Sequence, residues 1–97
     1  MSRVRFTEAV ADDLEEIYDY IANDSLAAAD KVFMRLQKCW QLLAENPGIG
    51  RKRDNLEPNL RSIAEGSYVI FYHTISSGIE LVRIVHSSRD MERVFGS

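Results

Sequence analysis

The sequence predicts an α+β domain in which an N-terminal strand and an αα-hairpin precede an antiparallel β-meander. Apolar residues with helical spacing dominate the first half of the chain, and β-rich runs separated by short glycine and serine turns dominate the second half. The 97 residues are 45% hydrophobic and 28% charged, as in an ordinary globular chain. Since domains usually contain about 100 to 200 residues, residues 1–97 are expected to form a single domain.

The first predicted elements are a strand and a helix. Polar and apolar side chains alternate over Arg3–Phe6, which indicates a short strand, and Thr7 can cap a helix that begins near Glu8. Apolar residues in that helix recur at spacings of three and four and form one stripe: Val10, Leu14, Ile17 and Ile21. We therefore expect one face of this helix to cover other parts of the fold.

A second helix follows the turn and cap residues at 23–25. Its apolar positions again follow helical spacing: Ala29, Val32, Phe33, Leu36, Cys39, Trp40 and Leu43. Cys39 lies within this stripe, which predicts a small buried hydrophobic side chain rather than a nucleophile. Asn46-Pro47-Gly48 ends the helix, so the two helices form an αα-hairpin.

The second half of the chain begins with a polar loop over Ile49–Asn59. Three β-rich runs come next: Leu60–Glu65, Tyr68–Ile75 and Ile79–Ser87. The turns between them, Gly66-Ser67 and Ser76-Ser77-Gly78, suit hairpin connections. The segment Arg89–Phe95 is expected to add one helical turn or a short strand, and the sheet to contain about four strands.

Strand register predicts which side chains share a face of the sheet. Pairing Ile75 with Ile79 places Tyr68 opposite His86, Ile70 opposite Ile84 and Tyr72 opposite Val82. The other face then contains Val69, Phe71, His73, Leu81, Arg83 and Val85. Both faces are largely apolar, whereas an αα-hairpin covers only one. We therefore expect a partner to cover the face formed by Tyr68, Ile70, Tyr72, Val82 and Ile84.

Charge is strongly segregated along the chain, although the net charge is only −3. Residues 8–30 contain eight acidic residues and no Lys or Arg, whereas residues 31–53 contain six basic residues and one acidic residue, Glu45. Such asymmetry favours oriented contacts, and the basic half could meet phosphates or an acidic protein. Two solvated faces that attract each other within the fold are the alternative.

Several classes of protein are disfavoured. Charged residues Arg3, Arg5 and Glu8 interrupt the N-terminus, and the longest apolar run is Tyr68–Tyr72, so neither a signal peptide nor a membrane span is expected. A single cysteine and this composition predict a cytoplasmic protein. The small core leaves no room for a large cofactor. No metal site is expected, since His73 and the other histidine lie on opposite faces of the predicted sheet.

Six segments in this order resemble the ParE branch of the RelE/ParE toxin superfamily. They are Asp13–Ile17, Tyr20–Ala22, Asn46–Arg51, Leu60–Arg61, Tyr68–Tyr72 and Arg83–Asp90. The resemblance spans nearly the whole chain and implies a β-α-α-β-β-β fold. It also implies the toxin of a type II toxin–antitoxin pair that inhibits DNA gyrase, blocks replication and so causes growth arrest and plasmid stabilisation. A ParD-like antitoxin would wrap the toxin in a hetero-oligomer, and operator DNA would be contacted only through that antitoxin.

Two alternatives remain within the same superfamily. RelE-type relatives cut mRNA on the ribosome, and Arg61, Arg83 and His86 are the candidate catalytic residues for that reaction. Against it, Phe95 stands where that pattern often has a tyrosine, and phenylalanine cannot transfer a proton. The other alternative is a degenerate toxin that only binds antitoxin. The structural alternative to these roles is that His86 packs on Tyr68 and that Arg83 forms an ion pair with a carboxylate at position 13 or 16.

The favoured interpretation is a protein-binding toxin rather than an enzyme. Residues without an obvious internal partner are assigned to toxicity: Arg61, His86, Arg89 and Arg93. Acidic residues of the antitoxin are expected to meet Arg51, Arg53 or Arg61.

Overall fold

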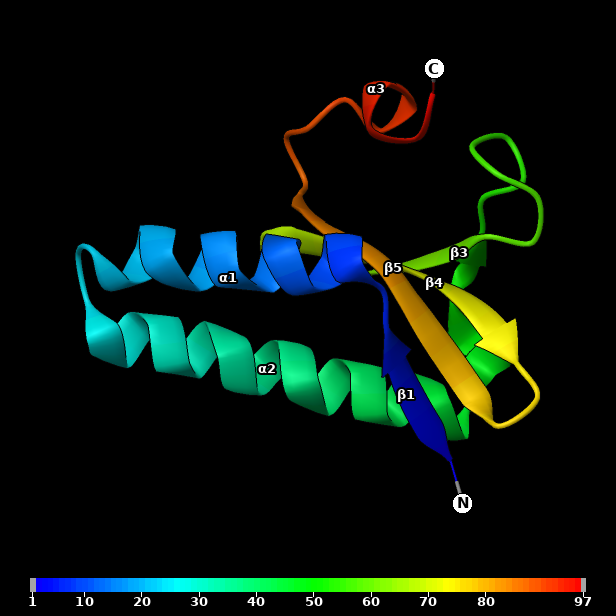
Figure 1. Cartoon of the computed structure of the whole chain (residues 1–97), viewed down its shortest axis with the longest axis horizontal. Helices are drawn as coiled ribbons and strands as arrows, with labels where there is room; N and C mark the ends of the chain where they lie inside the picture. Colours follow the sequence, from blue (N-terminus) through cyan, green and yellow to red (C-terminus); the bar gives the residue numbers. More distant parts are fainter. Residues whose placement is uncertain (1, 97) are drawn as a thin grey trace.

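The computed structural model describes residues 2–96 and contains two long helices beside one sheet (Figure 1). The elements in chain order are β1 (Arg3–Phe6), α1 (Glu8–Ala22), α2 (Leu26–Glu45), the 3-10 helix η1 (Pro47–Ile49), β2 (Arg51–Lys52), β3 (Arg61–Glu65), β4 (Tyr68–Ile75), β5 (Gly78–His86) and α3 (Met91–Phe95). This confirms the α+β fold class, the αα-hairpin and the meander. Within residues 2–96 the sheet has five strands in the order β1-β5-β4-β3-β2.

Two details of the sheet differ from the sequence prediction. β1 pairs in parallel with β5, so the sheet is mixed rather than purely antiparallel. The short strand β2, predicted as loop, pairs antiparallel with β3 and forms one edge. Two residues are too short to produce a period-2 hydropathy pattern, so sequence alone could not identify β2. Within the described part of the chain, none of the helices is long and apolar enough to cross a membrane.

The helix boundaries follow the predicted caps. Thr7 accepts a hydrogen bond from the Val10 amide through its hydroxyl oxygen, and Ser25 accepts one from the Ala28 amide. Both residues are extended N-caps, which satisfy amides that the first helical turn leaves free. The Thr7 hydroxyl also donates to the carbonyl of Val82 at 3.1 Å, so the start of α1 is fixed to β5.

A β-bulge changes the register between β4 and β5. Tyr68 lies opposite His86 and Ile70 opposite Ile84, as predicted. Beyond the irregularity at Phe71/Tyr72 the pairing shifts by one residue, so that Tyr72 lies opposite Leu81 and Ile75 opposite Gly78. Val82 is the extra residue of β5 and has no partner in β4, which leaves its carbonyl for the Thr7 hydroxyl. The predicted Tyr72–Val82 and Ile75–Ile79 pairs are therefore wrong.

The sheet face covered by the helices is the one predicted to be free. Ile70 and Tyr72 are fully buried and Ile84 nearly so, together with Val10, Leu36, Trp40 and Leu43 from the helices. Leu81 joins this core because the bulge turns it to the helix side. The prediction that a partner binds this face is therefore wrong for Ile70, Tyr72 and Ile84, which the helices enclose, whereas Tyr68 is only partly buried. Hydropathy was similar on both faces, so it could not show which one the hairpin covers.

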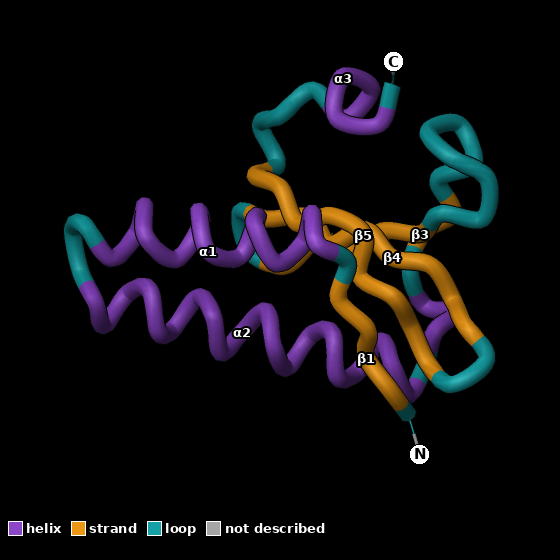
Figure 2. Tube along the Cα trace, in the orientation of Figure 1, coloured by secondary structure: helices purple, strands orange, loops and turns teal. Residues whose placement is uncertain are grey.

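The opposite face is partly covered by the chain itself. Its buried cluster contains Leu60, Phe71 and Val85, and partly buried apolar side chains pack against it: Leu56, Val69, Val82, Met91, Val94 and Phe95. The rings of Phe71 and Phe95 lie 4.6 Å apart. Figure 2 shows α3 and the loop after β2 on the side of the strands away from α2. This face is therefore partly covered before any partner binds.

The turn around η1 is fixed by two side chains from the sheet. The buried Tyr72 hydroxyl donates to the Pro47 carbonyl at 2.7 Å and accepts from the Gly50 amide at 2.9 Å. Arg61 donates to the carbonyls of Gly48 and Gly50. Arg61 therefore has internal partners, contrary to the sequence expectation, and it helps to position the chain that enters β2.

We expect Tyr72→Phe to lower the free energy of unfolding by about 1–3 kcal/mol, because the buried Gly50 amide loses its acceptor.

Burial also raises the pKa of Tyr72 above its ordinary value. The folded protein then holds the phenolic proton of Tyr72 more tightly than the unfolded chain does. The free energy of unfolding therefore falls as pH rises above about 10, the pKa of tyrosine in the unfolded chain. Urea unfolding at neutral and alkaline pH should show a smaller alkaline loss for Tyr72→Phe. Tyr20→Phe, on an exposed side chain, is the control and should leave stability within about 0.5 kcal/mol.

Candidate functional site

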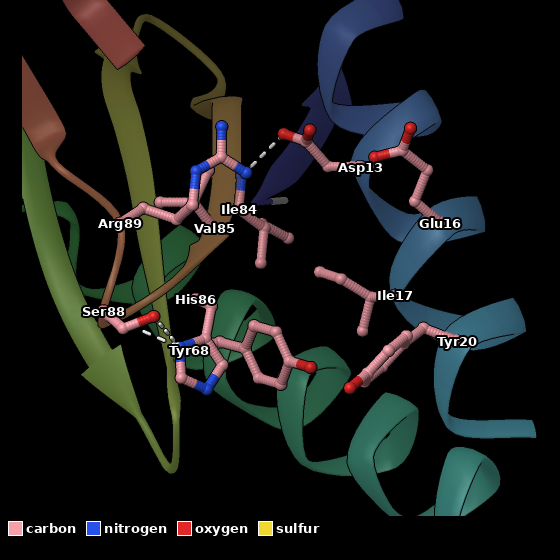
Figure 3. A pocket seen from close by; sticks show the side chains of 10 residues that line it. All are labelled: Asp13, Glu16, Ile17, Tyr20, Tyr68, Ile84, Val85, His86, Ser88 and Arg89. Carbon is pink, nitrogen blue, oxygen red and sulfur yellow. Dashed lines mark hydrogen bonds between the residues drawn. The ribbon is translucent and has the colours of Figure 1, made fainter. Parts of the chain in front are cut away.

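A pocket of about 530 Å³ lies between α1 and the ends of β4 and β5 (Figure 3). Its lining combines acidic, aromatic, aliphatic and basic side chains: Asp13, Glu16, Ile17, Tyr20, Tyr68, Ile84, Val85, His86, Ser88 and Arg89. Residues from α1 form one wall, and residues from the two strands and the segment after β5 form the other. This volume is within the range of ordinary ligand pockets, so the site is large enough to receive a side chain of a partner.

The wall of the pocket is held together by Asp13, which is only 7% exposed. Its two oxygens accept from Arg83 Nε at 2.7 Å and from Arg83 Nη2 at 2.9 Å, and Oδ2 also accepts from the Ile84 amide at 3.0 Å. The hydrogen bond to Asp13 raises the pKa of Arg83, against the opposing effect of burial. The predicted ion pair of Arg83 is therefore confirmed, with Asp13 as its partner.

His86 uses one ring nitrogen in a local contact with Ser88, and the described residues give the other ring nitrogen no hydrogen-bond partner. Nδ1 accepts from the Ser88 amide at 3.1 Å and lies 2.8 Å from the Ser88 hydroxyl oxygen. Because an amide can only donate, Nδ1 carries a lone pair, and the neutral imidazole carries its proton on Nε2. The ring also contacts Tyr68 edge-to-face at 5.5 Å. The predicted packing on Tyr68 is confirmed, and His86 supplies a hydrogen-bond donor at Nε2.

The rest of the pocket has an apolar floor and a polar rim. Ile17 and Ile84 line it from opposite walls, and Figure 3 shows the hydroxyls of Tyr20 and Tyr68 turned toward one another. Tyr20 is 77% exposed, whereas partial burial raises the pKa of Tyr68. Asp13 already accepts three hydrogen bonds, and the rim otherwise carries the carboxylate of Glu16, the hydroxyls of Tyr20, Tyr68 and Ser88, and the guanidinium of Arg89. The rim therefore offers both donors and acceptors beside the apolar floor, which suits a polar group next to an apolar side chain.

The pocket gathers only part of the residues predicted from sequence. Tyr68, Ile84, His86 and Arg89 line it, whereas the other predicted residues lie elsewhere: Arg51, Arg53, Arg61, Ile70, Tyr72, Val82 and Arg93. Sequence reasoning missed the contributions of Ile17, Tyr20 and Ser88. The available signal for Tyr20 was its position between Ile17 and Ile21, the last two residues of the apolar stripe, but nothing in the sequence indicated which strand end faces α1.

The basic residues near β2 form a second, more polar surface. Arg51 and Lys52 are exposed on the edge strand. Arg53 instead donates to the Ser62 hydroxyl at 3.2 Å, and its guanidinium lies 5.6 Å from the centre of the Phe71 ring. Of these two predicted antitoxin contacts, Arg51 is exposed and can contact a partner, whereas Arg53 already has partners inside the fold.

The C-terminal arginines line a separate hollow of about 350 Å³ with Asp90 and Val94. Among residues 2–96, neither Arg89 nor Arg93 makes a side-chain hydrogen bond or ion pair, so both remain available. Arg89 lines both this hollow and the pocket beside α1, so one cation borders the two sites.

The three candidate catalytic residues do not meet in one place. Arg61 lies opposite Tyr72 and His86 opposite Tyr68, which are four residues apart on β4. At about 3.3 Å per residue this is about 13 Å along the strand, and Arg61 and His86 also lie on different strands. Arg83 is committed to Asp13. Over residues 2–96 there is also no cluster of three or more His, Cys, Asp or Glu side chains that could hold a metal ion.

Comparison with known proteins gives a consistent result at the family level. The family model described as "ParE toxin of type II toxin-antitoxin system, parDE" matches residues 4–91. Toxin ParE1 of Mycobacterium tuberculosis (strain CDC 1551 / Oshkosh) is 33% identical over 94 residues, which cover 95% of this chain and 96% of the relative. The match therefore spans the hairpin, the sheet and the pocket.

Two further matches extend this picture. Toxin RelE2 of Caulobacter vibrioides is 34% identical over 89 residues, covering 92% of this chain and 99% of the relative. The solved structure described as "Chromosomal ParDE TA system from P. aeruginosa" superposes with a TM-score of 0.73, at 23% identity over 89% of this chain and 96% of the other. At that identity the structural likeness concerns the fold.

Proposed function

Because the chain belongs to the ParE family of toxins of type II toxin–antitoxin systems, we propose that it acts in the cytoplasm as an inhibitor of DNA gyrase. Inhibition proceeds by protein binding rather than by catalysis and blocks replication. A cognate antitoxin neutralises the toxin in a hetero-oligomer and makes any contact with operator DNA.

The separation of the basic candidate residues carries the argument against catalysis. General acid–base chemistry on RNA needs a proton-transfer group and charge-stabilising cations around one reacting phosphate. Here His86 and Arg61 lie at different levels of the sheet, and Arg83 is neutralised by Asp13. Phe95 packs on Phe71 and offers no proton. A protein-binding role needs no such convergence.

The pocket beside α1 is the proposed gyrase-contacting site. Its lining includes His86, whose Nε2 has no partner among the described residues, and Arg89, which also lines the hollow next to Arg93. Arginine and aromatic side chains around a hollow are frequent centres of protein interfaces. Arg61, which was also assigned to toxicity, acts in this proposal only by positioning the η1 turn through its bonds to Gly48 and Gly50.

The antitoxin is proposed to bind elsewhere on the molecule. Its acidic residues meet the exposed Arg51, with Arg53 nearby, and its apolar residues meet the partly covered sheet face at Val69 and Val82. This assignment replaces the buried side chains at 70, 72 and 84, which a partner cannot reach without opening the core.

The test is a gyrase supercoiling and cleavage-complex assay with the purified chain, run beside an mRNA cleavage assay on programmed ribosomes. We expect inhibition of supercoiling without mRNA cleavage, and addition of the antitoxin should restore supercoiling. Cleavage of mRNA with unaffected gyrase would favour the RelE-like alternative, for which the RelE2 relative is the supporting observation. Inactivity in both assays with intact antitoxin binding would indicate a degenerate toxin.

A further inference from the structure

A second hollow lies between the two long helices, and its lining comes entirely from them. It has a volume of about 340 Å³ and is lined by Leu14, Glu15, Tyr18, Asp19 and Phe33. Leu14 and Phe33 supply an apolar floor, and the Tyr18 hydroxyl is already engaged by donating to Asp30 Oδ1 at 2.7 Å. This hollow is distinct from the pocket beside β5, since none of these five residues lines that pocket.

A row of aromatic rings extends the hollow toward β1. Tyr18 contacts Phe33 at 6.2 Å, Phe33 contacts Trp40 at 6.0 Å, and Trp40 contacts Phe6 at 5.3 Å, all edge-to-face. Phe6, at the end of this row, is 48% exposed. Leu26 is 65% exposed and lies two helical turns before Phe33, hence on the same side of α2. We call this apolar strip, from Leu26 through the hollow to Phe6, the hairpin groove.

The rim of the hairpin groove is acidic. Along α1, exposed acidic residues recur at spacings of four, three and four and therefore share a face: Glu8, Asp12, Glu15 and Asp19. Asp30 adds a further carboxylate from α2. No Lys or Arg occurs between residues 8 and 30, so the chain does not neutralise this rim locally. The basic residues of α2 (Lys31, Arg35 and Lys38) are spaced to lie on its other side.

We propose that the hairpin groove binds a basic amphipathic helix of a partner protein. An apolar strip between two helices receives the apolar face of a third helix, and its acidic rim pairs with lysine or arginine residues that flank that face. A second copy of the chain that bound with its own hairpin groove against this one would place two rows of carboxylates opposite each other. Their mutual repulsion disfavours that arrangement. The inference holds whether or not gyrase is the target, because it depends only on the hairpin surface.

The experiment uses a synthetic peptide as the probe. An amidated peptide of about 18 residues, with leucines at helical spacing and lysines on either side, is titrated into the full chain. Calorimetry measures affinity, and NMR shift mapping identifies the contacted residues. We expect shifts centred on Tyr18 and Phe33, and weaker affinity at high salt. The double variant Glu15→Lys/Asp19→Lys should weaken binding by about tenfold or more.

Matched controls make the result decisive. Glu45→Lys/Glu92→Lys changes the net charge equally, at exposed acidic positions outside the groove, and should leave affinity within about twofold. A peptide of the same composition with scrambled periodicity should bind poorly. Three results would overturn the proposal. They are a glutamate-flanked peptide that binds as tightly as the lysine-flanked one, an equal loss of affinity in both double variants, and chemical-shift changes centred on residues outside the hairpin groove. Self-association of the free chain that Glu15→Lys/Asp19→Lys abolishes would also overturn it, in favour of a second copy.

Discussion

Asp13→Ala should lower the free energy of unfolding by about 3–5 kcal/mol, the largest stability effect expected of any single substitution considered for this chain. The change removes the acceptor of two guanidinium bonds and of the Ile84 amide. It therefore leaves a partly buried cation and a buried amide unpaired, and both are costly in a low-dielectric environment. Urea unfolding followed by circular dichroism measures the loss. Glu16→Ala, on an exposed neighbour in the same helix, should change stability by at most about 0.5 kcal/mol.

A double variant separates the two components of this effect. In Asp13→Leu/Arg83→Met the unpaired charge is gone and apolar side chains replace the ion pair, so much of the stability should return. The Ile84 amide still lacks its acceptor, which should leave a deficit of about 1–3 kcal/mol. If Asp13→Ala were as stable as the parent, Asp13 would not hold α1 against β5 as described.

Apart from the two-residue strand β2, the helices and strands of this fold could be predicted from the sequence because each carries a local signal. Thr7 and Ser25 cap the helices, and the turn glycines separate the strands at the expected places. The ion pair of Arg83 was also foreseeable, since a charged side chain among apolar strand residues requires a partner. Local chemistry was sufficient for these features.

The faces of the sheet were not readable in the same way. A single extra residue, Val82, shifts the register and turns Leu81 to the helix side. The choice between two apolar faces depends on how the hairpin crosses the sheet, which is a long-range property. For the same reason Ile17 and Tyr20 could not be assigned to the pocket, because their neighbours at its other wall lie more than 45 residues away in sequence.

The pocket beside α1 yields the second large expected effect, on gyrase inhibition. His86→Ala/Arg89→Ala should raise the concentration needed for half-maximal inhibition by about 100-fold, or about 2.7 kcal/mol, if both side chains are central contacts. Antitoxin affinity should stay nearly unchanged, because the proposed antitoxin surface lies at Arg51 and Val69. The control is Arg35→Ala/Lys38→Ala, which removes two cationic side chains from exposed positions of α2. This control should retain full inhibition.

Two conservative substitutions of His86 distinguish a binding role from a structural one. Asn places an acceptor near the position of Nδ1 and can retain the bond from the Ser88 amide, whereas Gln places a donor near the position of Nε2. If the Nε2 proton contacts the target, His86→Gln should retain most of the inhibition and His86→Asn should lose it. The reverse order would mean that His86 acts by holding the turn at Ser88, and the contact with gyrase would then belong to Arg89 and the residues that follow it.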